Sequence, residues 1–290
     1  MRAIEYILLI SVLMLGMLLF WPIVTDLAMS PLRPLMDDGI WSYLRLMIPF
    51  ALSVLTLSLI LKGLGTGMDQ LLLERDRKDG ERKTAASVFM ILLLLFVSTS
   101  FLSPTMEKTG YPGSLTFLSL ARSIVFIPLQ VFAEELMFRV IPARMFFPEG
   151  FGNNKVADMA FVVASGLLFA AMHGMNPEVT GATLKWVIML NYFASGLFLA
   201  LFAVMTKGFL TGIAYHAAVN LYVSVFVNLE NGVIPSYSFY VDRAQNYEVT
   251  SLFSTVAASL VTILIITLTK KNGRNRKEYG KSKSQESLQG

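Results

Sequence analysis

Two adjacent carboxylates and an arginine stand in a segment that is otherwise apolar, and these residues have the types and spacing that chemistry would need. Glu134 and Glu135 are followed four residues later by Arg139, between apolar stretches over 126–132 and 140–142. Inside a bilayer each such charge costs about 2.5–3.5 kcal/mol on insertion scales, so ionisable groups in membrane spans are rare and commonly functional. If this run crosses a membrane, the two glutamates are candidate members of a functional site.

The two glutamates are expected to differ in role. Glu135 and Arg139 lie four residues apart with the acid first, which is the favourable order for an ion pair on a helix. Glu134 is turned by about 100° around the helix from its neighbour and points elsewhere. We therefore predict that Glu135 pairs with Arg139 and that Glu134 remains free for chemistry.

The chain has only two histidines, and both stand in apolar runs. Phe169 precedes His173, and His216 precedes Asn220, in each case by the four residues that place two side chains on one helix face. Depth along each predicted helix puts His216 at roughly 12 Å and His173 at roughly 21 Å from the same membrane side. The histidines can meet Glu134 only if the helix of His173 starts lower, tilts or is submerged.

The composition indicates a membrane protein. The chain is 54% hydrophobic and 15% charged, whereas soluble domains carry about 25% charge. The net charge of +4 comes from basic residues that gather in one loop and in the C-terminal tail, the distribution typical of cytoplasmic membrane loops rather than of nucleic-acid binding. The absence of cysteine excludes disulfides, thiol nucleophiles and thiolate metal sites.

Apolar runs near the ~20 residues that cross a bilayer predict an all-α, polytopic membrane protein with about eight transmembrane helices. Pro128 and Pro142 are expected to interrupt the long fourth run, and small residues in the fifth are expected to allow close helix packing. An even number of spans places both termini on one side, which the positive-inside rule assigns to the cytoplasm. The predicted spans cover 4–24, 41–64, 85–102, 114–147, 159–175, 183–205, 209–227 and 250–269.

These spans divide the chain into four parts. We predict N-terminal helices over 1–113 with a charged cytoplasmic loop near 65–84, and a core over 114–228. An outer loop and the last helix follow over 229–269, and the basic cytoplasmic tail over 270–290 is expected to be disordered.

The motifs Glu134-Glu135-x-x-x-Arg139, Phe169-x-x-x-His173 and His216-x-x-x-Asn220 follow one another on three separate predicted spans. This order resembles the three-motif signature of the CAAX-protease and bacteriocin-processing (CPBP, or ABI) family, which includes the type II CAAX prenyl endopeptidases. The resemblance covers about 114–228 and implies glutamate-dependent intramembrane proteolysis without a cofactor. It implies that Glu134 activates a water, His173 holds and polarises that water, His216 and Asn220 donate hydrogen bonds to the oxyanion, and Glu135, Arg139 and Phe169 support them.

Several alternatives stay open at this point. Glu134, His173 and His216 would also make a His₂Glu zinc set, the composition of catalytic zinc proteases, although the usual His-Glu-x-x-His spacing is absent. A non-enzymatic protein that binds a partner or provides bacteriocin self-immunity is a second alternative. A transporter or proton relay is a third, but the sequence lacks the inverted repeat expected of a transporter.

The expected partners are a peptide or membrane-protein substrate and the lipid bilayer, with no nucleic acid. The expected location is a prokaryotic plasma membrane, with both termini cytoplasmic. Gln130, Tyr192 and Tyr215 are interpreted as packing groups.

Overall fold

The computed structural model describes the helical body of the chain and leaves much of the N-terminal third undescribed. The predicted first span up to residue 19, most of the second over 41–64, and the loop near 65–84 up to residue 77 lie outside the described residues. The described residues are 20–35, scattered positions between 41 and 62, 78–102, 106–108, 117–147, 150–174, 177–229, 240–242 and 247–289.

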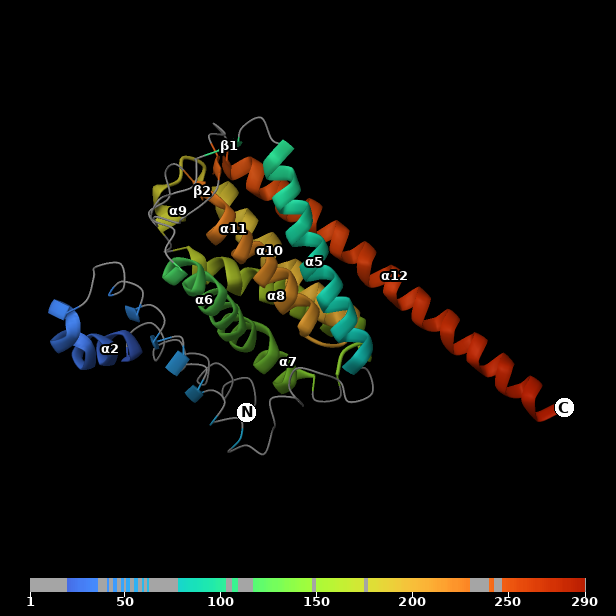
Figure 1. Ribbon diagram of the computed structural model, residues 1–290. Helices are drawn as coiled ribbons and strands as arrows, with labels where there is room; N and C mark the ends of the chain where they lie inside the picture. The colour runs from blue at the N-terminus through green and yellow to red at the C-terminus, as the bar shows by residue number, and fades with distance from the viewer. Residues whose placement is uncertain are drawn as a thin grey trace.

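Helices packed side by side make up this body (Figure 1). Before it stand α2 (Trp21–Met29) and the 3₁₀-helix η2 (Ser30–Leu35). The body contains α5 (Lys78–Leu102), α6 (Phe117–Glu135), the π-helical segment η3 (Leu136–Val140), α7 (Ile141–Phe146), α8 (Lys155–His173), α9 (Pro177–Gly181), α10 (Lys185–Thr206), α11 (Leu210–Phe226) and α12 (Tyr247–Gln289).

The predicted helical class is confirmed for this body, and the count of about eight spans is not. Among the described residues, four helices are long and apolar enough to cross a membrane: 80–99, 155–173, 185–206 and 248–271. The predicted fourth and seventh spans are also helical, as α6 and the 17-residue α11, but they are not among these four.

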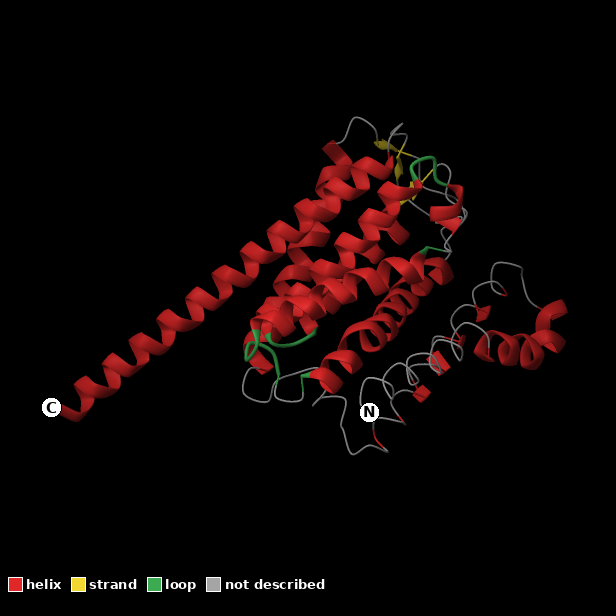
Figure 2. Cartoon of the chain, turned by 180° about the vertical axis from the view of Figure 1, so that it is seen from behind, coloured by secondary structure: helices red, strands yellow, loops and turns green. Residues whose placement is uncertain are grey.

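Three short strands were not predicted. β1 (Met106–Lys108), β2 (Val227–Leu229) and β3 (Tyr240–Asp242) form a small sheet in the order β1-β3-β2 at one end of the bundle (Figure 2). β1 pairs antiparallel with β3, and β2 pairs parallel with it. Pairing satisfies backbone groups where the chain leaves its helices, but strands of three residues are too short to leave a sequence period.

The fourth run is interrupted in a different way from the prediction. Pro128 lies inside α6 without ending it, and Pro142 stands in the first turn of α7, directly after the π-helical segment η3. The irregularity is the single π-turn η3, which begins directly after Glu135 and contains Arg139. Such turns inside α-helices are frequent at functional sites.

Close packing of α8 against α10 depends on two glycines. A Cβ on Gly196 would lie 2.7 Å from the Cβ of Phe169 and 3.0 Å from the Cα of Gly166. A Cβ on Gly166 would lie 3.0 Å from the ring and the backbone of Phe193. The expected close approach through small residues in the fifth span is therefore confirmed at Gly166.

The C-terminal tail is helical, which corrects the expectation of disorder. α12 has 43 residues and projects far beyond the rest of the bundle in Figures 1 and 2. Nζ of Lys270 donates a hydrogen bond to the backbone carbonyl of Met205, near the end of α10. The segment after Lys270 contains no proline and is rich in Lys and Arg, so the preceding helix can continue through it despite Gly273 and Gly280.

Candidate active site

Glu134 has one bonded and one unbonded oxygen. Its Oε1 accepts a hydrogen bond of 2.9 Å from Nε2 of Gln130, one turn earlier on α6. Its Oε2 is buried without a hydrogen-bond partner and lies 3.7 Å from Nε2 of His216 and 4.0 Å from Nε2 of His173. The structure therefore brings together three of the predicted site residues around one carboxylate oxygen.

Glu135 is the more fully hydrogen-bonded member of the pair, because one of its oxygens accepts from two donors. Its Oε1 lies 2.5 Å from Nη1 of Arg139 and 2.8 Å from Nδ1 of His216, and its side chain is 1% exposed. The predicted ion pair between Glu135 and Arg139 is thus present. Because a carboxylate accepts hydrogen bonds, Nδ1 of His216 carries a proton, and Nε2 of this ring is directed towards Glu134.

His173 is the last residue of α8. Its Nδ1 lies 2.8 Å from the backbone carbonyl oxygen of Phe169. A carbonyl only accepts, so Nδ1 donates its proton there, and in the neutral ring Nε2 presents a lone pair. The ring contacts two aromatic side chains, with centroid distances of 4.2 Å to Phe169 and 4.4 Å to Tyr192.

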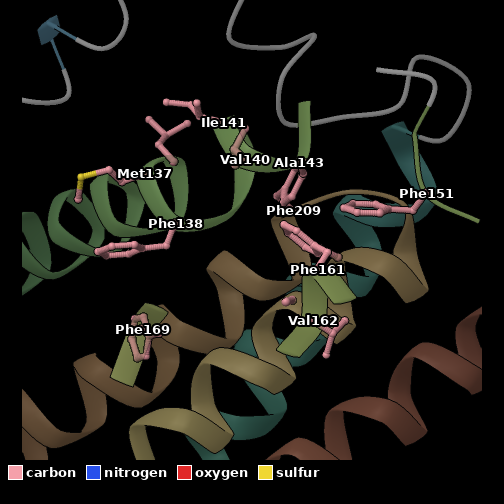
Figure 3. Packing of buried hydrophobic residues seen from close by; sticks show 13 residues of the cluster. Met137, Phe138, Val140, Ile141, Ala143, Phe151, Phe161, Val162, Phe169 and Phe209 are labelled. Atoms are coloured by element: carbon pink, nitrogen blue, oxygen red, sulfur yellow. The ribbon is translucent and has the colours of Figure 1, made fainter. Parts of the chain in front are cut away.

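The two histidines meet at Glu134 although they stand at different distances from the starts of their helices. Nε2 of each lies within 4.0 Å of Oε2 of Glu134, so the structure satisfies the condition set by the depth estimate. The rings of Phe161 and Phe209 both contact Phe151, at 5.3 and 6.0 Å, within the apolar cluster in Figure 3. This cluster joins α8 to the residues that precede α11.

Arg139 is fully buried and contacts both Glu135 and Phe169. Its Nε and Nη2 have no hydrogen-bond partner, and its guanidinium carbon lies 4.6 Å from the ring centroid of Phe169. A cation over an aromatic face is attracted by the ring quadrupole. Phe169 therefore contacts both Arg139 and His173, which gives this predicted supporting residue a structural role.

The distances between Glu134 and the two histidines are those that a bridging water spans. Distances of 3.7 and 4.0 Å are too long for direct hydrogen bonds, and such gaps are commonly bridged by water. A water that donates one proton to Oε2 of Glu134 and the other to Nε2 of His173 would satisfy both acceptors. The arrangement is thus suited to hold and polarise a water molecule.

Two predictions about the site remain untested. Asn220 is half-buried on α11, one turn after His216, and its role towards an oxyanion stays a prediction. Within the described ranges, no group of three or more His, Asp or Glu side chains is arranged to hold a metal ion. The zinc alternative stays a prediction, which the functional test addresses with a chelator.

Two buried carboxylates outside the motifs fix the helices that carry the site. Oε1 of Glu81, on α5, accepts from the backbone N–H of Leu210 at 2.9 Å, at the start of the helix that holds His216. Oε1 of Glu248, on α12, accepts from the N–H groups of Thr183 and Leu184 at 3.2 and 3.3 Å, just before α10. Carboxylates at helix N-termini satisfy free N–H groups and oppose the helix dipole.

Sequence reasoning missed part of this arrangement. Gln130 and Tyr192 were interpreted as packing groups, whereas both contact predicted site residues. The spacing of four residues between Gln130 and Glu134 was a usable signal for the first contact. No local signal links Tyr192 to His173 or Glu81 to Leu210, because each pair joins different helices.

Comparison with known proteins supports the resemblance. Residues 114–222 match the family described as "Type II CAAX prenyl endopeptidase Rce1-like", which confirms the predicted family resemblance over this part of the chain. The chain is 27% identical over 181 residues to the uncharacterized protein YyaK of Bacillus subtilis (strain 168), and this match covers 60% of the chain and 57% of that relative. The comparison with solved structures found no match. The family match and the four apolar helices identify an integral membrane protein.

Proposed function

We propose that this protein is an intramembrane endopeptidase in which Glu134 activates a water molecule. The observation that carries the proposal is the buried, unbonded Oε2 of Glu134, which faces Nε2 of both histidines at 3.7 and 4.0 Å. The match of residues 114–222 to an endopeptidase family supports the same assignment.

In the first step, Glu134 accepts a proton from the water while Nε2 of His173 accepts the second hydrogen bond and orients the oxygen. The oxygen attacks the carbonyl carbon of the scissile peptide bond. Proton transfer by a positioned side chain typically contributes about 10²–10⁴-fold in rate. Glu134 then returns the proton to the leaving amine, which restores the carboxylate.

The developing oxyanion needs hydrogen-bond donors. His216 is the first proposed donor, through Nε2; because Nδ1 already donates to Glu135, this role requires a proton on both ring nitrogens. Asn220 is the second proposed donor. Each such donor typically contributes about 10²–10³-fold in rate.

The proposed substrate is a peptide or membrane protein, with a prenylated CAAX-type C-terminus as the first candidate because of the matched family. The proposed location is a prokaryotic plasma membrane with both termini in the cytoplasm, which rests on the basic loop and tail. A partner-binding or self-immunity protein without catalysis is the alternative from a different class.

The test uses the full chain reconstituted in lipid vesicles. The substrates are a prenylated CAAX-type peptide, the same peptide without the prenyl group, and an unrelated transmembrane peptide, with products mapped by mass spectrometry. We expect the wild-type protein to cleave at least one of them and a His173→Ala variant, purified in parallel, to lose this activity.

Two outcomes would count against the proposal. Equal cleavage by the His173→Ala protein would assign the activity to a contaminant. The absence of any cleavage, together with a partner-dependent immunity phenotype that survives His173→Ala, would favour the non-enzymatic alternative. A chelator arm separates mechanisms, because the glutamate mechanism predicts an unchanged rate and a zinc protease predicts its loss.

A further inference from the structure

We infer that Tyr192 on α10 is a positioning residue that holds the imidazole of His173 in the orientation that the site needs. This inference rests on the proposed function, since it assigns Tyr192 a task within the same site. Tyr192 lies outside the three motifs, and its ring stacks on the imidazole with a centroid distance of 4.4 Å and an interplanar angle of 25°.

The position of His173 explains why its ring needs support. It is the final residue of α8 and is followed by Gly174, whose backbone N–H already bonds to Ala171. The ring is 16% exposed and has one hydrogen bond within its own helix, from Nδ1 to the carbonyl of Phe169. A single bond to Nδ1 leaves the ring free to rock about it, which would displace Nε2 from Glu134.

Two aromatic contacts from different helices restrict that motion. Phe169 contacts the ring from within α8 at 4.2 Å and an interplanar angle of 41°, whereas Tyr192 contacts it from α10. Aromatic pairs contribute about 0.5–1.5 kcal/mol beyond area burial. Of these two ring contacts, only the one from Tyr192 comes from another helix.

The close crossing of α8 and α10 places Tyr192 where it can stack. Gly196, one helical turn after Tyr192, lies against Gly166 and Phe169, where a Cβ would approach to 2.7 Å. The helices α8 and α10 are antiparallel at this crossing. Gly166 lies against Gly196, and the later Gly174, directly after α8, lies against the earlier Met189 of α10. His173 lies two turns after Gly166 and Tyr192 one turn before Gly196, and their rings stack there.

The presence of only two histidines makes this inference directly measurable. Full-length protein labelled with ¹⁵N-histidine gives the ring signals of His173 and His216 alone, and a His216→Gln variant assigns them. We expect His173 in the wild-type protein to be one tautomer, with the proton on Nδ1. Tyr192→Phe should preserve that signal, whereas Tyr192→Leu should produce a mixture of tautomers or a broadened signal.

Cleavage kinetics provide the second readout. We expect Tyr192→Leu to lower kcat by about 3- to 10-fold, the rate equivalent of losing one aromatic pair, with KM within about twofold of wild type. Tyr192→Phe should keep the wild-type kcat. Phe198→Leu is the matched control, because Phe198 also lies on α10 and stacks on Phe202 away from the site.

The outcomes separate this inference from the proposed function. A wild-type tautomer signal in Tyr192→Leu would overturn the inference, and so would a Tyr192→Phe variant as impaired as Tyr192→Leu, since the hydroxyl would then matter rather than the ring. Failure of the wild-type protein to cleave would overturn the proposed function and leave the tautomer measurement to decide on Tyr192. If Tyr192→Leu does not fold, Tyr192→Met removes the ring while keeping the apolar volume, with the same expectations.

Discussion

Buried glutamates occur in two regions of the described part of the molecule, at the motif site and near the starts of two helices, and they are bonded differently. Glu134 and Glu135 are 7% and 1% exposed, whereas Glu81 and Glu248 are 5% and 3% exposed, so burial does not distinguish the two regions. Glu81 and Glu248 accept hydrogen bonds from backbone N–H groups that begin α11 and precede α10. Among these four glutamates, only Glu134 has a buried oxygen without a hydrogen bond, and that oxygen faces two imidazole rings. Asp158, in the first turn of α8, also has a buried oxygen without a hydrogen bond, so the two facing imidazoles are what distinguishes Glu134.

This difference shows what marks a reactive carboxylate in an apolar environment. Burying a charge without partners is costly, so a satisfied carboxylate is adequately explained by the structure it stabilises. An unsatisfied one needs another explanation, such as a substrate or a water held for chemistry. Glu135 belongs with the satisfied group although it adjoins Glu134 in the sequence.

The largest expected effect on stability comes from removing Arg139. Its loss leaves Glu135 buried with Nδ1 of His216 as the remaining donor, and breaking a buried ion pair typically costs about 3–5 kcal/mol. We expect Arg139→Met to lower the free energy of unfolding by this amount, measured by thermal or denaturant unfolding in detergent micelles. The double variant Glu135→Gln/Arg139→Met should recover part of the loss, and a loss below about 1 kcal/mol would contradict a structural role for the pair.

A smaller effect is expected at Gly208, where α10 passes into α11. A Cβ at this position would overlap the carboxylate of Glu81, which must move away from the N–H of Leu210. Gly208→Ala should cost about 1–3 kcal/mol of stability, as overpacking commonly does. Gly80→Ala is the matched control one residue from Glu81, because nothing lies within 4 Å of its Cβ; equal effects of the two substitutions would refute the role assigned to Glu81.

The smallest effect is expected from the second helix-capping carboxylate. Glu248→Ala removes the acceptor for the N–H groups of Thr183 and Leu184, and loss of a helix cap typically costs about 0.5–2 kcal/mol. The melting temperature should fall accordingly, whereas kcat of the folded variant should stay within about twofold of wild type. A tenfold loss of kcat, about 1.4 kcal/mol of transition-state stabilisation, would place Glu248 among the groups that matter for catalysis.

Much of the site could be predicted from the sequence, because contacts within one helix follow a fixed spacing. The Glu135–Arg139 pair and the shared helix of Phe169 and His173 follow from a separation of four residues. The apolar runs likewise predicted α5, α6, α8, α10, α11 and the first part of α12, whereas α9, between the fifth and sixth runs, was not predicted. These six helices therefore required no tertiary information.

Contacts between helices could not be predicted in the same way. The stacking of Tyr192 on His173 depends on how closely Gly166 and Gly196 let α8 and α10 approach. The cap from Glu81 to Leu210 joins residues 129 positions apart. The π-turn η3 also left no signal, since its residues are ordinary apolar helix formers around Arg139.

The central claim is that chemistry resides in Glu134 and that the other buried glutamates are structural. Its most direct test is the cleavage rate of Glu134→Gln relative to that of Glu248→Gln, with both variants purified as folded proteins and assayed on the same peptide. The account predicts that Glu134→Gln loses about 10²–10⁴-fold in kcat while keeping the wild-type melting temperature, and that Glu248→Gln keeps its kcat. A Glu134→Gln protein that cleaves within a few-fold of the wild-type rate would contradict the account.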